Sequence, residues 1–148
     1  MTKLFGGKEM EATLEQNTIG FQRLSGVRLT AGYILSGLSS LFLLFDGIMK
    51  LFKPAVVVNG TVELGYSESV IIPLGFVLTL ITILYVIPRT AVLGAVLVTG
   101  YLGGAVATHV RVGAGAFPIV FPVIVGTLVW GGLYLRDARI AKLLPLRK

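Results

Sequence analysis

The chain has 148 residues, of which 55% are hydrophobic and 14% are charged, and its formal net charge is +6. Soluble proteins carry roughly 25% charged residues, so this composition excludes an ordinary soluble globular domain. The basic residues border apolar stretches and do not gather in a nucleic-acid-binding motif, so we expect no nucleic acid as a partner. Cysteine is absent, which excludes disulfides and thiolate chemistry within the chain.

The first 28 residues are polar and of mixed charge, without the apolar core of a signal peptide. We expect residues 1–28 to form a cytosolic tail that is flexible or weakly helical in residues 1–20, with an early break at Gly6-Gly7. Residues 29–136 hold four apolar stretches long enough to cross a bilayer as helices. These spans are about 29–51, 67–87, 90–110 and 117–135, and residues 137–148 follow as a basic cytosolic tail. The sequence thus predicts an all-α membrane protein, a four-transmembrane-helix bundle.

The first span carries polar residues on one side, where Ser36, Ser39, Asp46 and Lys50 fall at helical spacing. A carboxylate facing lipid is costly, so this side is expected to face the bundle. Asp46 and Lys50 are one turn apart, in the favourable order of acid before base. The pair has two interpretations. Either the two charges simply neutralise each other, or Asp46 orients His109 in a polar pocket.

Residues 54–66 are too short to span the bilayer. Pro54 is typical of a helix start, and Asn59-Gly60 weakens a continuous helix. We predict a short interfacial or re-entrant segment between the first and second spans. Ser67 is a candidate N-cap for the second span, and Pro73 is a candidate kink near its start.

The third span carries two rows of small residues at four-residue spacing and ends in the only histidine, His109. Small residues let a neighbouring helix approach closely, and in lipid this close packing holds helices together. We therefore predict helix packing at Gly100, Gly103, Gly104 and Ala107, with the first span as the neighbour that approaches.

The basic residues are unevenly divided between the two ends of the spans. Ten of the 13 Lys and Arg residues lie on the side of the termini, and Lys50, Lys53 and Arg111 lie on the other. Loops rich in Lys and Arg remain cytoplasmic, so we predict a multi-pass protein with both termini cytoplasmic. Asp46 and His109 then lie at the outer end of the bundle.

Five residues are candidate ligand-binding residues of an outer polar pocket: Asp46, Lys50, Tyr101, His109 and Arg111. His109 either binds a ligand headgroup or moves a proton, or it only hydrogen-bonds a neighbouring segment. Arg111 either clamps an anionic group or anchors the span at lipid headgroups. Tyr101 lies mid-span, where an unpaired hydroxyl is costly, so we expect it to bond a Ser or Thr of the first or second span.

The sequence contains no Ser-His-Asp triad, zincin helix or dinucleotide-binding fingerprint. A lone histidine does not make a conventional metal site, so we predict none. We predict no catalytic residue and no cofactor ligand, and we do not expect the chain to be an enzyme on its own.

Short motifs mark the ends of the predicted spans. They are Gly47-Ile48-Met49-Lys50-Leu51, Leu64-Gly65-Tyr66, Ile87-Pro88-Arg89 and Ala107-Thr108-His109. Together they resemble the DoxX-like family of small four-helix bacterial membrane proteins, over residues 30–136. At Asp46 the chain departs from the family's usual apolar residue or alanine, so the resemblance assigns Asp46 no role. The resemblance implies the bacterial cytoplasmic (inner) membrane, with relatives linked to quinone-coupled sulfur oxidation and to membrane redox complexes.

Three functions remain open at this point. The chain is a non-catalytic accessory subunit, packed in the bilayer against other membrane subunits or its own copies in a larger redox or transport assembly. Alternatively, it is a quinone- or lipid-linked oxidoreductase component, with His109 binding a quinone carbonyl in the outer pocket. The third hypothesis is a small transporter of an apolar ligand, for which an inverted repeat would be expected. The first is preferred, because the chain offers no cofactor ligands of its own.

Overall fold

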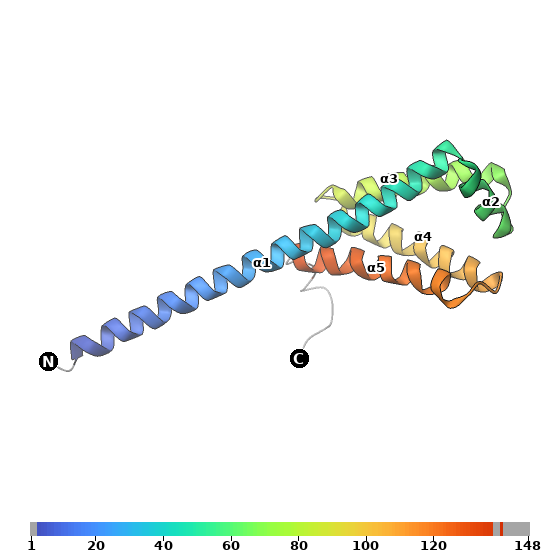
Figure 1. Ribbon diagram of the computed structural model, residues 1–148. Helices are drawn as coiled ribbons and strands as arrows, with labels where there is room; N and C mark the ends of the chain where they lie inside the picture. The colour runs from blue at the N-terminus through green and yellow to red at the C-terminus, as the bar shows by residue number, and fades with distance from the viewer. Residues whose placement is uncertain (1–2, 138–139, 141–148) are drawn as a thin grey trace.

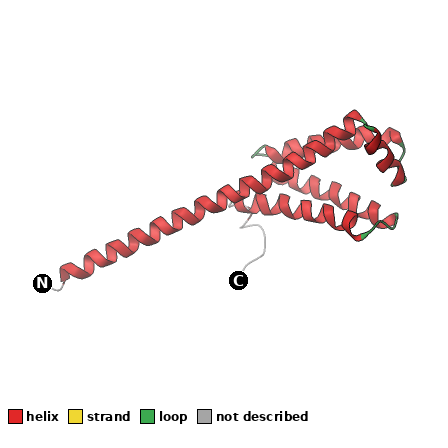
Figure 2. Cartoon of the chain, in the orientation of Figure 1, coloured by secondary structure: helices red, strands yellow, loops and turns green. Residues whose placement is uncertain are grey.

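The computed structural model describes residues 3–137 and 140, with the side chains of residues 26–137 and 140. The described chain is helical nearly throughout (Figures 1 and 2). Its elements are α1 (Lys3–Phe52), α2 (Ala55–Glu63), the 3-10 turn η1 (Glu68–Val70), α3 (Ile71–Val86), α4 (Ala91–Arg111) and α5 (Ala116–Arg136). Within the described residues, four segments are long and apolar enough to span a membrane: Gly26–Phe52, Glu68–Val86, Ala91–Arg111 and Ala116–Arg136. The predicted all-α membrane protein with four spans is therefore confirmed.

The α1 helix is longer than its membrane span. It runs without a break from Lys3 to Phe52, and Figure 1 shows its first half extending beyond the bundle. The helix break expected at Gly6-Gly7 is not observed. Each glycine costs about 1 kcal/mol in a helix interior, but a helix that is already nucleated by its membrane span extends cheaply. Residue 28 thus marks the bundle's edge and not a helix end. The predicted tail 137–148 lies outside the described residues, apart from Asp137 and Ile140.

The four spanning helices form a bundle in which α1 and α4 are diagonally opposite. The α1 helix packs against α3 and α5, and α4 packs against the same two helices. The first span therefore does not approach the third along its glycines, contrary to the sequence-based expectation. A Cβ added at Gly100, Gly103 or Gly104 would meet no atom within 4 Å, and Ala107 is exposed.

The opposite face of α4 makes the contacts. Ala91, Ala95, Val98 and Leu102 are buried at helical spacing. Small residues occur on both faces of this helix, so their spacing alone did not identify the packed face. The close approach on α4 is at Gly94, where an added Cβ would lie 2.3 Å from the backbone nitrogen of Tyr85.

Close helix contacts also join α1 to its two neighbours. An added Cβ at Gly132 of α5 would lie 2.5 Å from Ser36 Oγ, and one at Gly47 would lie 2.6 Å from Thr79 Oγ1 of α3. The buried Tyr85 hydroxyl donates to the Val129 carbonyl oxygen at 2.8 Å and lies 2.9 Å from Ser36 Oγ. These polar contacts satisfy groups that lipid could not hydrogen-bond.

The two ends of the bundle differ. At the terminal end, where the N-terminal half of α1 leaves the bundle and α5 ends, Arg28 donates to the Tyr134 carbonyl and Arg136 to the Tyr85 carbonyl. At the other end, here the loop end, the α1/α3 pair diverges from the α4/α5 pair (Figure 1). The short α2 helix lies at the loop end and buries none of its residues.

Candidate functional site

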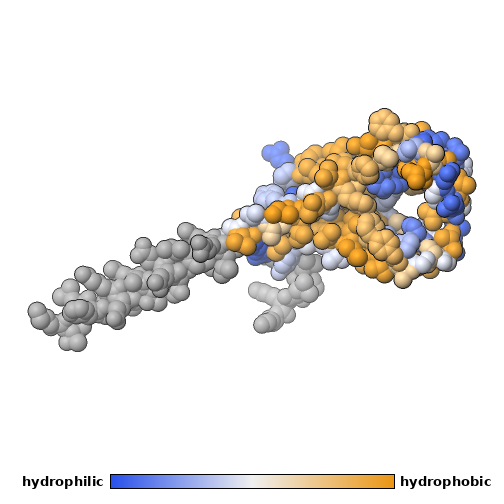
Figure 3. Space-filling view, in the orientation of Figure 1, coloured by the Kyte–Doolittle hydropathy of each residue, from blue (hydrophilic) through white to orange (hydrophobic). Residues whose placement is uncertain are grey.

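A cavity of about 500 Å³ lies at the loop end between the diverging helix pairs. Figure 3 shows the molecule hollowed there, with hydrophilic residues beside the opening and a largely hydrophobic surface around the bundle. Its polar lining residues are Asp46, Lys50, Thr61, Tyr66, Tyr101, Thr108 and His109. Its apolar walls include Phe42, Leu43, Leu74, Leu102, Phe121, Pro122 and Val125. Four of the five residues predicted as ligand-binding thus line one cavity.

Asp46 and Lys50 occupy the α1 wall of this cavity. Lys50 Nζ lies 2.5 Å from Asp46 Oδ1, and the two side chains are 17% and 38% exposed respectively. Their four-residue spacing on one helix brings them together without help from the rest of the fold. The second carboxylate oxygen of Asp46 has no hydrogen-bond partner among the described residues, so it remains available to a ligand.

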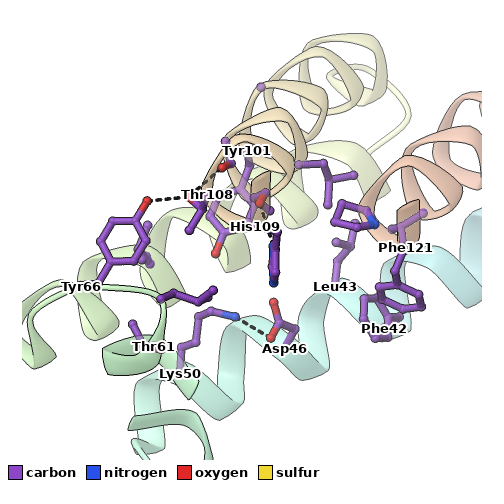
Figure 4. A pocket seen from close by; sticks show the side chains of 18 residues that line it. Phe42, Leu43, Asp46, Lys50, Thr61, Tyr66, Tyr101, Thr108, His109 and Phe121 are labelled. Atoms are coloured by element: carbon purple, nitrogen blue, oxygen red, sulfur yellow. Dashed lines mark hydrogen bonds and ion pairs between the residues drawn. The ribbon is translucent and has the colours of Figure 1, made fainter. Parts of the chain in front are cut away.

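His109 faces Asp46 from the α4 wall (Figure 4). Its Nδ1 atom lies 2.8 Å from the carbonyl oxygen of Ala105 on the same helix. A carbonyl oxygen only accepts, so Nδ1 carries the proton, and Nε2 of the neutral ring is an acceptor. Within the described residues, His109 and Asp46 form neither a hydrogen bond nor an ion pair, although both point into the cavity.

Tyr101 lies deeper in the cavity, on α4. Its hydroxyl makes no hydrogen bond to any described residue, so the expected bond to a Ser or Thr of the first or second span is not observed. The hydroxyls of Ser39 and Thr82 instead donate to carbonyl oxygens one turn earlier in their own helices. Such local bonds are common for Ser and Thr in helices. The Tyr101 hydroxyl therefore opens onto the cavity.

Arg111 is not a lining residue. Its guanidinium donates from Nη2 to the Leu64 carbonyl oxygen at 2.5 Å. Leu64, Gly65 and Tyr66 form the segment that leads from α2 towards η1, here called the strap. Gly65 adopts a positive φ of 81°, and an added Cβ there would lie 3.0 Å from the Arg111 guanidinium. Arg111 thus tethers the strap to the end of α4.

A second tether was not predicted from the sequence. The Tyr66 hydroxyl lies 2.8 Å from Thr108 Oγ1 (Figure 4). Because Thr108 Oγ1 donates to the Gly104 carbonyl oxygen, Tyr66 is the donor to Thr108. These residues are 42 positions apart, so only the tertiary structure brings them together. The strap therefore closes one side of the cavity through its contacts with α4 side chains.

Gly100 and Gly104, which were expected to pack against another helix, line the cavity instead. Their missing side chains provide part of its volume, because an added Cβ would meet open space. Gly103 lies in a second groove between α4 and α5, beside Gly126 and Trp130. Among the described residues, no three potential His, Asp or Glu ligands lie together to hold a metal ion.

The family model described as the DoxX-like family matches residues 34–132 of the chain. The chain belongs to the DoxX-like family. The matched region of this DoxX-like chain includes every polar residue of the cavity and excludes the N-terminal half of α1. No curated protein and no solved structure matches the chain significantly.

Proposed function

We propose that this DoxX-like membrane protein is a non-catalytic binding subunit that holds a small amphiphilic molecule, such as a quinone or a lipid, in the loop-end cavity. The observation that carries the proposal is the convergence of Asp46, Lys50, Tyr101 and His109 on one cavity with otherwise apolar walls. Small-molecule sites commonly have this form, a mostly hydrophobic pocket with a few polar groups that orient the ligand.

The size of the cavity supports the proposal. Ligand pockets commonly measure roughly 300–1,000 Å³, and this one measures about 500 Å³. Phe42 and Phe121 lie edge to face in its wall, with ring centroids 5.3 Å apart. An amphiphile could place its ring or chain against these side chains and its headgroup near His109. A molecule dissolved in the bilayer is the natural ligand of such a site.

We place this site at the non-cytoplasmic face of a bacterial cytoplasmic membrane, with both termini in the cytoplasm. Ten basic residues on the terminal side against three on the other support this orientation. The ligand headgroup would then meet the outer aqueous phase. The chain's part in a larger redox or transport assembly, through other membrane subunits or its own copies, belongs to the same proposal. The open surface beside Gly103 supports such an association.

Gly104→Leu tests the proposal. The leucine Cβ would strike no neighbour, and the rest of the side chain would occupy space in the cavity that Gly104 lines. Gly103→Leu is the matched control, because it adds the same side chain to the same helix but faces the other groove. Each protein is purified in mild detergent, and its bound small molecules are extracted and identified by mass spectrometry.

We expect an amphiphilic molecule to copurify with the wild-type and Gly103→Leu proteins and to be lost from Gly104→Leu. Absence of any bound amphiphile from the wild type, or equal binding by the two variants, would contradict the proposal. Complex size on native gels reports the assembly role separately. Loss of a partner from Gly103→Leu alone would support it, and a wild-type protein that is monomeric in mild detergent would count against it.

A further inference from the structure

When the His109 ring is neutral, the polar end of the cavity presents two hydrogen-bond acceptors to each other. His109 uses Nδ1 as a donor to the Ala105 carbonyl oxygen, which leaves Nε2 as an acceptor in the neutral ring. Figure 4 shows the ring directed at the Asp46 carboxylate. Two acceptors cannot bond each other, and none of the described residues donates to Nε2. The space between them therefore favours a group that brings a proton.

Lys50 satisfies only one side of the carboxylate. Its ammonium group contacts Asp46 Oδ1, and the oxygen that faces His109 has no partner in the described chain. The ion pair also balances the charge at this end of the cavity. A charged headgroup would be attracted by one of the two residues and repelled by the other. No net attraction would then offset the cost of removing its charge from water. The site thus favours a neutral headgroup over an ionised one.

The wall next to these acceptors is aromatic. Phe121 contacts Phe42 in the cavity wall, with ring centroids 5.3 Å apart and an interplanar angle of 76°. Aromatic side chains favour ring-bearing ligands, which they contact edge to face or in offset stacks. Tyr101 can both donate and accept through its hydroxyl, so it does not discriminate between donors and acceptors on a ligand.

We infer that the cavity prefers a neutral aromatic ligand whose hydroxyl group donates a hydrogen bond to His109 Nε2, beside the Asp46 carboxylate, that is, a phenol or a hydroquinone. The corresponding ether or quinone, which has no proton to donate, would leave both acceptors unpaired. The inference rests on the proposed function, because it names the class of amphiphile that the site selects.

The test compares ligands that differ only in the donor. Full-length protein in lipid nanodiscs is titrated with para-octylphenol and with its methyl ether, and empty nanodiscs correct for partition into lipid. We expect the phenol to bind roughly tenfold more tightly, the effect of one added hydrogen bond. A short-chain hydroquinone should likewise bind more tightly than its quinone. His109→Leu should reduce the phenol-to-ether ratio, because it removes one of the two acceptors.

Thr127→Val is the matched control, since the exposed Thr127 hydroxyl bonds the Val123 carbonyl and Thr127 does not line this cavity. This variant should keep the wild-type ratio, and circular dichroism would verify that both variants are folded. His109→Gln retains a carbonyl acceptor, so its phenol-to-ether affinity ratio should lie between those of His109→Leu and the wild type. Equal binding of phenol and ether, or a ratio unchanged in His109→Leu, would overturn the inference and leave the proposed function standing. Binding of neither compound would also overturn the inference, and the copurification experiment with Gly104→Leu decides the proposed function separately.

Discussion

His109 and Asp46 face each other across the cavity from α4 and α1, two helices that lie diagonally in the bundle. Each has a separate local partner, the Ala105 carbonyl for His109 and Lys50 for Asp46. Neither partner closes the space between them, because each lies on the same helix as the residue it binds. The diagonal arrangement keeps these helices apart at the loop end, and the cavity occupies the resulting space.

The Asp46–Lys50 pair is expected to contribute modestly to stability. Asp46→Asn and Lys50→Met, alone and together, form a double-mutant cycle measured by equilibrium unfolding in mixed micelles. We expect a coupling of about 1 kcal/mol, small because the pair is partly open to the cavity. The Lys53–Glu68 pair is the control, with a longer contact of 3.3 Å and more exposed side chains. A coupling for Asp46–Lys50 no larger than that of the control would contradict the expectation.

The strap is expected to control access to the cavity. Tyr66→Phe removes its hydrogen bond to Thr108, so the strap should open more often. The chain has no cysteine, so Gly104→Cys provides a single reporter inside the cavity. We expect its reaction with a water-soluble maleimide to accelerate about three- to tenfold when Tyr66→Phe is added. Gly103→Cys, in the other groove, should be unaffected. Equal rates at Gly104→Cys with and without Tyr66→Phe would exclude this role.

Gly94 and Gly103 should respond in opposite ways to the same substitution. Gly94→Ala would bring Cβ within 2.3 Å of the Tyr85 backbone nitrogen, and backbone atoms cannot yield as a side chain can. We expect a loss of at least about 2 kcal/mol in unfolding free energy. Gly103→Ala meets open space and should stabilise the helix by up to about 1 kcal/mol. Similar unfolding free energies for the two variants would contradict the finding that α4 packs through the face that carries Gly94.

The orientation in the membrane is tested by labelling from one side. Gly115→Cys lies in the loop between α4 and α5, and Arg89→Cys lies in the turn between α3 and α4 at the opposite end. In spheroplasts, whose cytoplasmic membrane is intact, a membrane-impermeant maleimide should label position 115 and not position 89. The reverse pattern would place the cavity on the cytoplasmic side and refute the proposed orientation.

Local features of this protein follow from the sequence. The four spans were predictable because a bilayer requires long apolar runs, and each run is visible without knowledge of its neighbours. The contact between Asp46 and Lys50 was predictable for a similar reason, since one helical turn is enough to bring the two side chains together. The family resemblance over the same spans was confirmed as well.

Only the tertiary structure decided which face of each helix is packed. In water, hydropathy separates buried from exposed residues, but in lipid both kinds are apolar, so the pattern carries little information about neighbours. That is why the glycine row of α4 was assigned to helix packing, whereas Gly94 makes the close contact and Gly104 lines a cavity. The strap contacts of Tyr66 and Arg111 join residues more than 40 positions apart, and no local rule predicts them. The candidate site therefore depends on the divergence of two helix pairs, which the packing of the whole bundle determines.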